Sequence, residues 1–301
     1  MPSVSLIGCG RWGRNILRDL LALGCQVAVC DPDLSAREYA QAAGASAVAS
    51  VDELSTSDGM VIATPVSTHA AVIRQGLGSG IPIFVEKPLT SDVEAAREFA
   101  EIARGRLFVM DKWRYHPGIE ELARIARTGE LGAPLGMRLR QVGWGTPHLD
   151  VDVTWVLLPH CLAIALEVLG AVPAPRYAFA TMGGTRVVSL DGMLGDDGVL
   201  GERPWVSVEV SERNPVKVRE FQLHCEDGVA WLDEGWTDHI SIARGGVIEK
   251  RNVAPKLPLY AELEAFVRHL DGGPAPRSSV EEGAQVVEAI SELRFLAGLA
   301  R

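Results

Sequence analysis

Three glycines near the N-terminus are the first residues whose types and spacing indicate a chemistry. The stretch "GCGRWG" places Gly8, Gly10 and Gly13 in G-x-G-x-x-G register, after the apolar run "VSLI" and before a segment of helical periodicity. In such a turn the first glycine permits a tight bend, the second lets a pyrophosphate approach the backbone, and the third lets helix and strand pack closely. The phosphates accept hydrogen bonds from N–H groups at the helix N-terminus. We therefore predict a dinucleotide site made of Gly8, Cys9, Gly10, Arg11, Trp12 and Gly13.

An acidic residue follows at the distance expected for such a site. Asp31 ends the run "QVAVCD", about 20 residues after the glycine turn. A carboxylate there accepts hydrogen bonds from the adenosine ribose hydroxyls and repels a 2′-phosphate, which favours NAD over NADP. Arg11 and Arg37 provide the alternative, because a guanidinium near the turn could bind that phosphate.

A lysine stands where a parallel sheet exposes its carboxyl edge. Glu86, Lys87 and Pro88 follow the apolar run "IPIFV", and a lysine directly after a buried strand is costly to desolvate unless a partner or ligand meets it. We therefore expect the Lys87 ammonium to point into the crevice where open α/β sheets bind ligands. The alternative is a solvated loop lysine. The run "MVIATPVSTH" ends a second strand at the same edge.

The elements that must position these residues fall into two groups. Residues 1–118 alternate short apolar runs with helix-period segments, which predicts a parallel sheet covered on both faces. Residues 119–301 contain many alternating runs such as "WVSVEVSE" and "KVREFQLHC", which predict a mostly antiparallel sheet with a few helices. The fold class is therefore α/β, with an N-terminal Rossmann domain and a C-terminal α+β domain. In one alternative the last helix packs on the first domain.

Composition excludes several classes of protein. A net charge of −10 argues against a nucleic-acid partner, since phosphate binding needs a basic surface. No apolar run approaches the roughly 18 residues of a membrane span. The five cysteines show neither C-x-x-C nor zinc spacing, so we expect no metal, reduced thiols and a cytoplasmic location.

Five stretches resemble one enzyme family over nearly the whole chain. "GCGRWG", "ATPVSTH", "VEKPL", "KWRYHP" and "GELG" occur in the order and at the spacings of the glucose/fructose oxidoreductase and inositol dehydrogenase family, Gfo/Idh/MocA. The resemblance implies a nicotinamide cofactor bound also by Thr64, Pro65, His69, Glu86 and Lys87. It implies that Lys87 contacts the reacting oxygen, and that the second sheet is open and forms a homodimer or homotetramer interface.

The family's second catalytic motif is only partly present. Members carry D-x-G-x-H-x-x-D on a long helix, and "WVLLPHCLAIALEVLG" places His160 at the histidine position. Val156 and Ala163 stand where the family has aspartates, and Leu158 replaces the glycine. By the resemblance His160 exchanges the substrate proton, although a packed histidine, with Pro159 kinking or starting the helix, is the alternative. Asp152 could supply the missing carboxylate.

The segment "DKWRYHPGI" follows the last strand of the first domain. By the resemblance Arg114 holds an interdomain position, where its planar donors could bind a substrate carboxylate, phosphate or hydroxyl. Trp113 and Tyr115 offer flat faces to a ring, or pack between the domains. We expect His116 to be structural and His148 to line the path of the substrate.

Together these features predict an NAD(P)-dependent oxidoreductase acting on a small molecule. The predicted substrate is a sugar, a nucleotide sugar or a cyclitol, with Lys87 and His160 catalytic and Trp113 and Arg114 binding substrate. The alternatives are a reductase of a non-sugar C=O or C=N bond, or a silent protein that only senses a dinucleotide.

Overall fold

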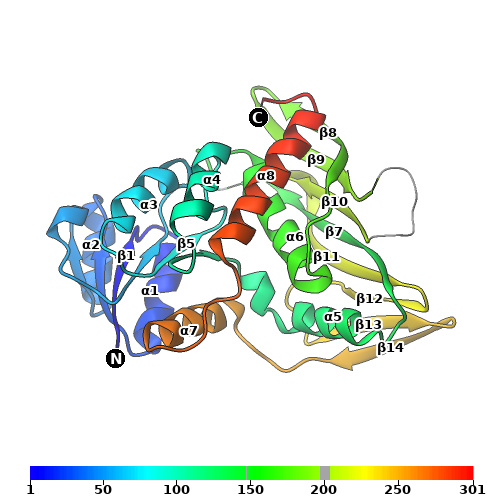
Figure 1. Cartoon of the computed structure of the whole chain (residues 1–301), viewed down its shortest axis with the longest axis horizontal. Coiled ribbons are helices and arrows are strands. Elements are labelled where there is room, and N and C mark those ends of the chain that lie inside the picture. The colour runs from blue at the N-terminus through cyan, green and yellow to red at the C-terminus, as the bar shows by residue number, and fades with distance from the viewer. Residues whose placement is uncertain (147, 197–203, 301) are drawn as a thin grey trace. The chain divides into compact units, whose positions relative to one another are not determined.

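The chain forms two compact units in a computed structural model that describes residues 1–146, 148–196 and 204–300 (Figure 1). The first unit comprises Met1–Lys112 and Leu257–Ala284, and the second comprises Trp113–Lys256 and Gln285–Arg301. The sequence-based division at residue 118 assigned everything after it to the second domain. In the structure, residues 257–284 belong to the first unit, because a helix in this segment packs in the core of that unit.

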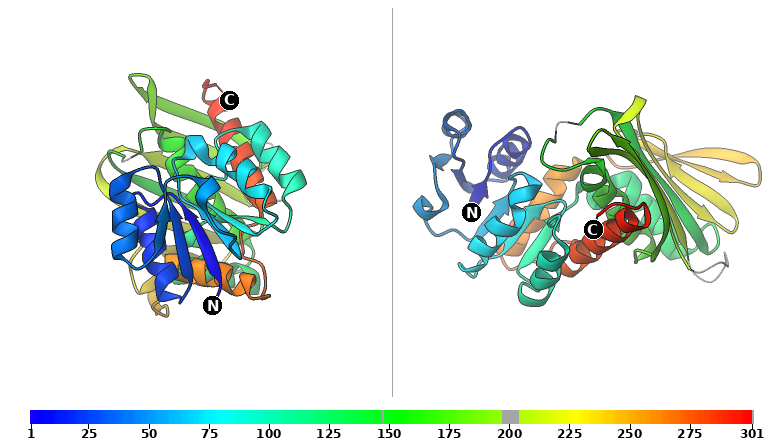
Figure 2. Two further views of the ribbon diagram at one scale, coloured as in Figure 1. Left: turned by 90° about the vertical axis from the view of Figure 1, so that its left-hand side faces the viewer. Right: turned by 90° about the horizontal axis from the view of Figure 1, so that it is seen from above.

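The first unit is built on a six-stranded parallel sheet of order β3-β2-β1-β4-β5-β6. Because helices cover both faces (Figure 2), β4 and the apolar part of β5 are buried continuously instead of alternating. The strands are β1 (Ser3–Ile7), β2 (Gln26–Cys30), β3 (Ser46–Val48), β4 (Gly59–Ile62), β5 (Ile83–Glu86) and β6 (Leu107–Met110). The helices are α1 (Gly13–Ala22), α2 (Leu34–Ala42), α3 (His69–Leu77), α4 (Val93–Ile102) and α7 (Pro258–Leu270).

Helix α7 completes this unit from the far end of the chain. Leu259, Leu263 and Phe266 recur at helical spacing and are buried in the same core as α1 and the sheet. The Phe266 ring stacks on Phe84 of β5, with 4.9 Å between ring centroids. The apolar stripe of α7 therefore packs on β4 and β5 in the core of the first unit, which is why residues 257–284 join that unit.

The second unit is built on an eight-stranded sheet of order β14-β13-β12-β11-β7-β10-β9-β8. All neighbouring pairs are antiparallel except β7 with β10, so the predicted mostly antiparallel sheet is confirmed. The strands are β7 (Pro134–Trp144), β8 (Pro175–Gly183), β9 (Arg186–Leu194), β10 (Trp205–Ser211), β11 (Arg213–Cys225), β12 (Gly228–Leu232), β13 (His239–Arg244) and β14 (Val247–Asn252).

Helices of the second unit lie against one face of this sheet (Figure 2). They are α5 (Pro117–Thr128), α6 (Val153–Leu169) and the later part of α8 (Val280–Leu296). Strand residues alternate accordingly, because Val206, Val208 and Val210 of β10 are buried while the residues between them are partly exposed. On the other face, Tyr177 and Phe179 are 62% and 51% exposed.

Two general features bear on function. Within the described residues, no helix combines the length and apolar character that crossing a bilayer requires. All five cysteines are buried free thiols, and the described part of the chain brings together no group of His, Cys, Asp and Glu side chains that could hold a metal ion.

Candidate active site

The glycine turn joins β1 to α1 in the shape that a pyrophosphate needs. Gly8 has φ of +92°, and a Cβ built on it would lie 2.8 Å from the carbonyl oxygen of Ala63. A Cβ on Gly10 would meet nothing within 4 Å, which leaves open space over the backbone at that position. Helix α1 has no side-chain cap at Trp12, whereas Asp33 and Asp92 cap α2 and α4. The uncapped N–H groups and open backbone fit a dinucleotide phosphate.

Asp31 lies directly against this turn. One carboxylate oxygen accepts a hydrogen bond from the Cys9 amide at 2.7 Å, and the other accepts from the Asp33 amide at 2.9 Å. Both bonds fix the side chain, which is 9% exposed. Each carboxylate oxygen can accept a second bond, so Asp31 keeps acceptor capacity for ribose hydroxyls.

The arginines that could bind a 2′-phosphate differ in exposure and in the groups that they already contact. The Arg37 guanidinium donates to the backbone carbonyls of Asp31 and Pro32 at 2.9 and 2.8 Å, so those donors are already used. Arg14 lies over the Tyr39 ring at 4.3 Å, and its buried Nε has no partner among the described residues. Arg11 is exposed.

The strand ends beside the turn carry the remaining predicted cofactor residues. Thr64 is half-buried and its hydroxyl accepts from Thr68, while Pro65 is exposed. His69, predicted to touch the cofactor, is instead completely buried. Its Nδ1 lies 2.9 Å from the carbonyl oxygen of Pro88 and its Nε2 lies 3.0 Å from that of Thr64. Both ring nitrogens therefore face the protein backbone, and burial lowers the pKa of His69.

Lys87 follows β5 directly and is half-buried, with Glu86 before it and a cis peptide bond to Pro88 after it. The Trp12 indole N–H donates to the Glu86 carboxylate, and the Lys112 ammonium lies 4.6 Å from the centre of the Trp12 ring. Burial raises the pKa of Glu86, while the nearby Lys87 ammonium and the Trp12 donor oppose that rise. The glycine turn and the lysine strand are thus joined by a polar contact.

A buried acid that the sequence reasoning missed lies in the same unit. Glu262 of α7 is 1% exposed, and its Oε2 has no partner among the described residues. Burial raises the pKa of Glu262 far above its usual range, and the nearby Glu86 and Asp111 carboxylates raise it further. The sequence does indicate that this acid is buried, because Glu262 lies on the apolar stripe of α7, three residues after Leu259 and four before Phe266.

The second unit places Trp113 against His160. The two rings meet edge to face with centroids 6.5 Å apart, and Trp113 also packs on Phe221 at 4.8 Å. Trp113 is 6% exposed, so most of its surface packs within the unit, whereas His160 is only half-buried. His160 could therefore offer a ring nitrogen to a substrate beside the edge of the indole.

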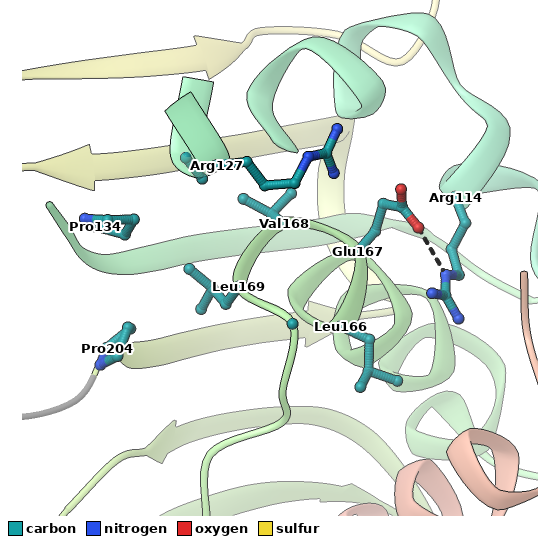
Figure 3. A pocket seen from close by; sticks show the side chains of 10 residues that line it. Arg114, Arg127, Pro134, Leu166, Glu167, Val168, Leu169 and Pro204 are labelled. Atoms are coloured by element: carbon teal, nitrogen blue, oxygen red, sulfur yellow. Dashed lines mark hydrogen bonds and ion pairs between the residues drawn. The ribbon is translucent and has the colours of Figure 1, made fainter. Parts of the chain in front are cut away.

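Arg114 is paired inside the second unit. Its Nε donates to the Glu167 carboxylate at 3.0 Å, and both side chains are mostly buried (Figure 3). The pair lies at one side of a cavity of about 430 Å³ between the C-terminal ends of α5 and α6. Its other lining residues are Ala126, Arg127, Pro134, Leu166, Val168, Leu169, Gly170 and Pro204.

Helix α6 begins at Val153, so Pro159 lies inside it and does not start it. Asp152 was a candidate to support His160, but its carboxylate caps the helix through the Thr154 amide at 3.1 Å and pairs with Arg294 at 2.8 Å. Val156 and Ala163, at the positions of the family aspartates, are buried. The backbone carbonyl of His148 accepts from Arg186 at 3.1 Å, which ties the preceding loop to β9.

Comparison with known proteins agrees with this geometry. Residues 3–109 match the model of the Gfo/Idh/MocA group, described as "Oxidoreductase family, NAD-binding Rossmann fold". Inositol 2-dehydrogenase 4 of Saccharopolyspora erythraea is 35% identical over 81% of this chain and 78% of its own length. D-xylose 1-dehydrogenase (NADP(+)) 2 of Haloferax volcanii is 26% identical over 78% and 77%.

A solved structure extends the match to both units. UDP-N-acetylglucosamine 3-dehydrogenase GnnA from Acidithiobacillus ferrooxidans superposes with a TM-score of 0.85 at 26% identity, covering 98% of this chain and 97% of the other. The predicted Rossmann fold and the predicted enzyme class are confirmed. With a relative of 35% identity spanning most of both sequences, this chain belongs to the Gfo/Idh/MocA family of oxidoreductases.

Proposed function

We propose that the protein is an NAD(P)-dependent dehydrogenase that transfers a hydride between nicotinamide and a hydroxyl-bearing or keto carbon of a sugar, nucleotide sugar or cyclitol. Its relatives are named as dehydrogenases of inositol, D-xylose and UDP-N-acetylglucosamine. The observation that carries the proposal is the half-buried Lys87 at the carboxyl end of β5, linked through Glu86 and Trp12 to a glycine turn that fits a dinucleotide.

The bound nicotinamide would supply or accept the hydride. The side chains of this protein would stabilise the charge on the reacting oxygen and transfer the hydroxyl proton. The Lys87 ammonium would donate a hydrogen bond to the reacting oxygen and stabilise the alkoxide that develops in the transition state. His160, at the edge of Trp113, would be the proton acceptor from a hydroxyl or donor to a carbonyl. Trp113 and Arg114 would contact the substrate. Trp113 would do so mainly through packing, and Arg114 while it is paired with Glu167.

For the cofactor we propose a preference for NAD over NADP. Asp31 is held at the turn by two backbone amides, where its carboxylate would repel a 2′-phosphate. The Arg37 guanidinium already donates hydrogen bonds to the backbone carbonyls of Asp31 and Pro32. Titrating NADH and NADPH against intrinsic fluorescence should give tighter binding of NADH. Tenfold tighter binding of NADPH would contradict the assignment and indicate that Arg11, Arg14 or Arg37 binds the phosphate.

The test of the reaction is absorbance at 340 nm with both cofactors. The panel contains cyclitols, free aldoses and UDP-sugars as hydroxyl substrates, and the matching ketones as acceptors. Turnover with any of these that depends on Lys87 supports the proposal. Cofactor binding without turnover on the whole panel contradicts it.

A second candidate is a reductase of a non-sugar C=O or C=N bond. The observation that favours it is that Val156, Leu158 and Ala163 of α6 are all buried and supply no carboxylate to hold polyol hydroxyls. Apolar ketones and cyclic imines added to the panel, assayed with NADH, separate the two candidates.

We further propose a cytoplasmic homodimer or homotetramer formed through the open face of the second sheet. The exposed Tyr177 and Phe179 side chains, together with Met193 at 42% exposure, form an apolar surface of the kind that a second copy buries. Five buried free thiols are compatible with a reducing compartment.

A further inference from the structure

We propose that His69 and Trp12 are positioning residues for Lys87, acting through its two chain neighbours, Pro88 and Glu86. The inference rests on the proposed catalytic role of Lys87. It concerns contacts within the first unit alone, and these contacts come from two different loops.

The contact on the Pro88 side is made by a buried ring. His69 follows the loop after β4, is 0% exposed, and lies between the carbonyl oxygens of Pro88 and Thr64 at 2.9 and 3.0 Å. Because burial lowers its pKa, the ring carries one N–H, which donates to one of these carbonyls. The ring therefore packs between the lysine loop and the loop that carries Thr64 and Pro65, and one of these two loops accepts its hydrogen bond.

The contact on the Glu86 side is made by the glycine turn. The Trp12 indole donates to one Glu86 oxygen, and the other oxygen accepts from the Lys87 backbone amide at 3.2 Å. The Glu86 carboxylate is thus held at the first residue of the lysine loop. The charged groups that act on it are Lys87, Lys112 and Asp111, and Glu262 lies within electrostatic range of it.

These two contacts matter because a lysine side chain is long and mobile. Its ammonium can reach one position reproducibly only if the backbone that carries it is held, and an error of about 1 Å in a reacting group costs on the order of 100-fold in rate. Holding Pro88 and Glu86 from separate loops fixes both ends of the residue. Supporting groups of this kind are what keep a catalytic side chain in productive geometry.

The first experiment compares turnover with dinucleotide affinity. His69→Ala should lower kcat by about 10²-fold, His69→Gln by less because an amide can still donate, and Trp12→Phe should also lower kcat. In the His69 variants the dissociation constant for NADH should stay close to that of the unaltered protein, because the phosphates are held by backbone N–H groups and His69 is completely buried. The matched controls are His269→Gln on α7, where the ring contacts Gly273 and Phe108, and Trp236→Phe, which alters an exposed tryptophan.

The second experiment is a double-mutant cycle with Lys87→Ala. If His69 and Trp12 act through Lys87, adding His69→Ala or Trp12→Phe to Lys87→Ala should cause no further loss of turnover. A merely structural role predicts losses that multiply. Should His69→Ala fail to fold, His69→Gln and Trp12→Phe carry the same cycle.

The third readout does not depend on turnover. The chain has only five lysines, at 87, 112, 217, 250 and 256, so reductive ¹³C-methylation gives few signals and Lys87→Ala assigns one of them. In Trp12→Phe the Lys87 signal should change in chemical shift or line width, because Glu86 loses the indole donor that holds it at the first residue of the lysine loop. Unchanged kcat in the His69 and Trp12 variants and an unchanged Lys87 signal in Trp12→Phe, with Lys87→Ala inactive, overturn the inference alone. Normal turnover in Lys87→Ala overturns the proposed function as well.

Discussion

Among single residues, Lys87 and His160 differ in how their surroundings prepare them for catalysis. Lys87 follows a buried strand and has a held neighbour on each side. His160 is half-buried beside Trp113, on a helix whose family acid positions are Val156 and Ala163. Valine and alanine side chains accept no hydrogen bond, so those two positions cannot set the tautomer of the His160 ring as a carboxylate would. The lysine should therefore carry more of the catalysis.

We expect Lys87→Ala to lower turnover by at least ~10²-fold, the usual effect of removing a positioned acid/base group. His160→Ala should cost less, because water can carry the proton in its place. Steady-state kinetics with the panel substrate that turns over fastest checks the order. A larger loss in His160→Ala, with Lys87→Ala nearly normal, would make the lysine structural.

Glu262 gives a prediction about stability and pH. Its folded-state pKa is raised far above the ordinary value of 4.5, mainly by burial, so the folded protein prefers the protonated carboxyl. The stability associated with that proton is complete below pH 4.5 and is lost as pH rises toward the folded-state pKa. Glu262→Gln, which cannot ionise, should therefore unfold at a higher temperature than the unaltered protein at pH 8, with a smaller difference at pH 5.

Thermal unfolding from pH 4.5 to 8.5 measures this difference. Glu264→Gln is the control, since Glu264 lies on the same helix in an exposed pair with Arg268. A constant difference for Glu262→Gln across this range would show that its carboxyl does not change charge on unfolding.

Among the elements, helix α6 begins at a carboxylate, that of Asp152, whose role is structural. Asp152 caps the helix, and Arg294 of α8 donates to both Asp152 and Thr154 at 2.8 and 2.7 Å. The first turn of α6 is thereby tied to α8 within the second unit. Asp152 stabilises the helix that presents His160, and its carboxylate is already occupied by these partners.

Asp152→Ala should lower the free energy of unfolding by more than the ~1 kcal/mol typical of a lost N-cap, because Arg294 also loses a mostly buried partner. Asp92→Ala is the matched control, since Asp92 caps α4 through the Glu94 and Ala95 amides. Urea unfolding compares the two variants. Equal losses would show that the Arg294 pair adds nothing.

The elements also show which parts of the site are readable from sequence. The glycine turn, Asp31 and Lys87 lie at fixed offsets from apolar runs, so strand periodicity places them at one sheet edge. The short strand β3 and the exposed edge strand β14 carry no strong apolar pattern, so periodicity does not predict them. The burial of His69 and the environment of Glu262 depend on contacts between distant segments. Local spacing carries no record of such contacts.

At the scale of the whole molecule, the open face of the second sheet is the feature that bears on association with a second copy. Its helix-covered face forms the core of that unit, while the face bearing Tyr177, Phe179 and Met193 is exposed in a single copy. A sheet face with this much apolar surface favours association with a second copy.

Light scattering at micromolar concentration should therefore give a mass above the 32.4 kDa of one chain. The double variant Tyr177→Asp, Phe179→Asp should shift the mass toward 32.4 kDa, because it places charges on the apolar face while leaving the core unchanged. Far-ultraviolet circular dichroism verifies that the variant is folded. A single-chain mass for the unaltered protein would contradict the proposed assembly.

The return of α7 to the first unit has a consequence for biosynthesis. A ribosome releases β5 and β6 long before residues 258–270, so Phe84 and Phe108 emerge without the helix that covers them. The nascent dinucleotide-binding unit cannot close its core until nearly all of the second unit has left the exit tunnel. A translation product arrested near residue 118 would expose this apolar surface to chaperones, and tunnel-tethered chains of increasing length should gain protease resistance only after residue 270 has emerged.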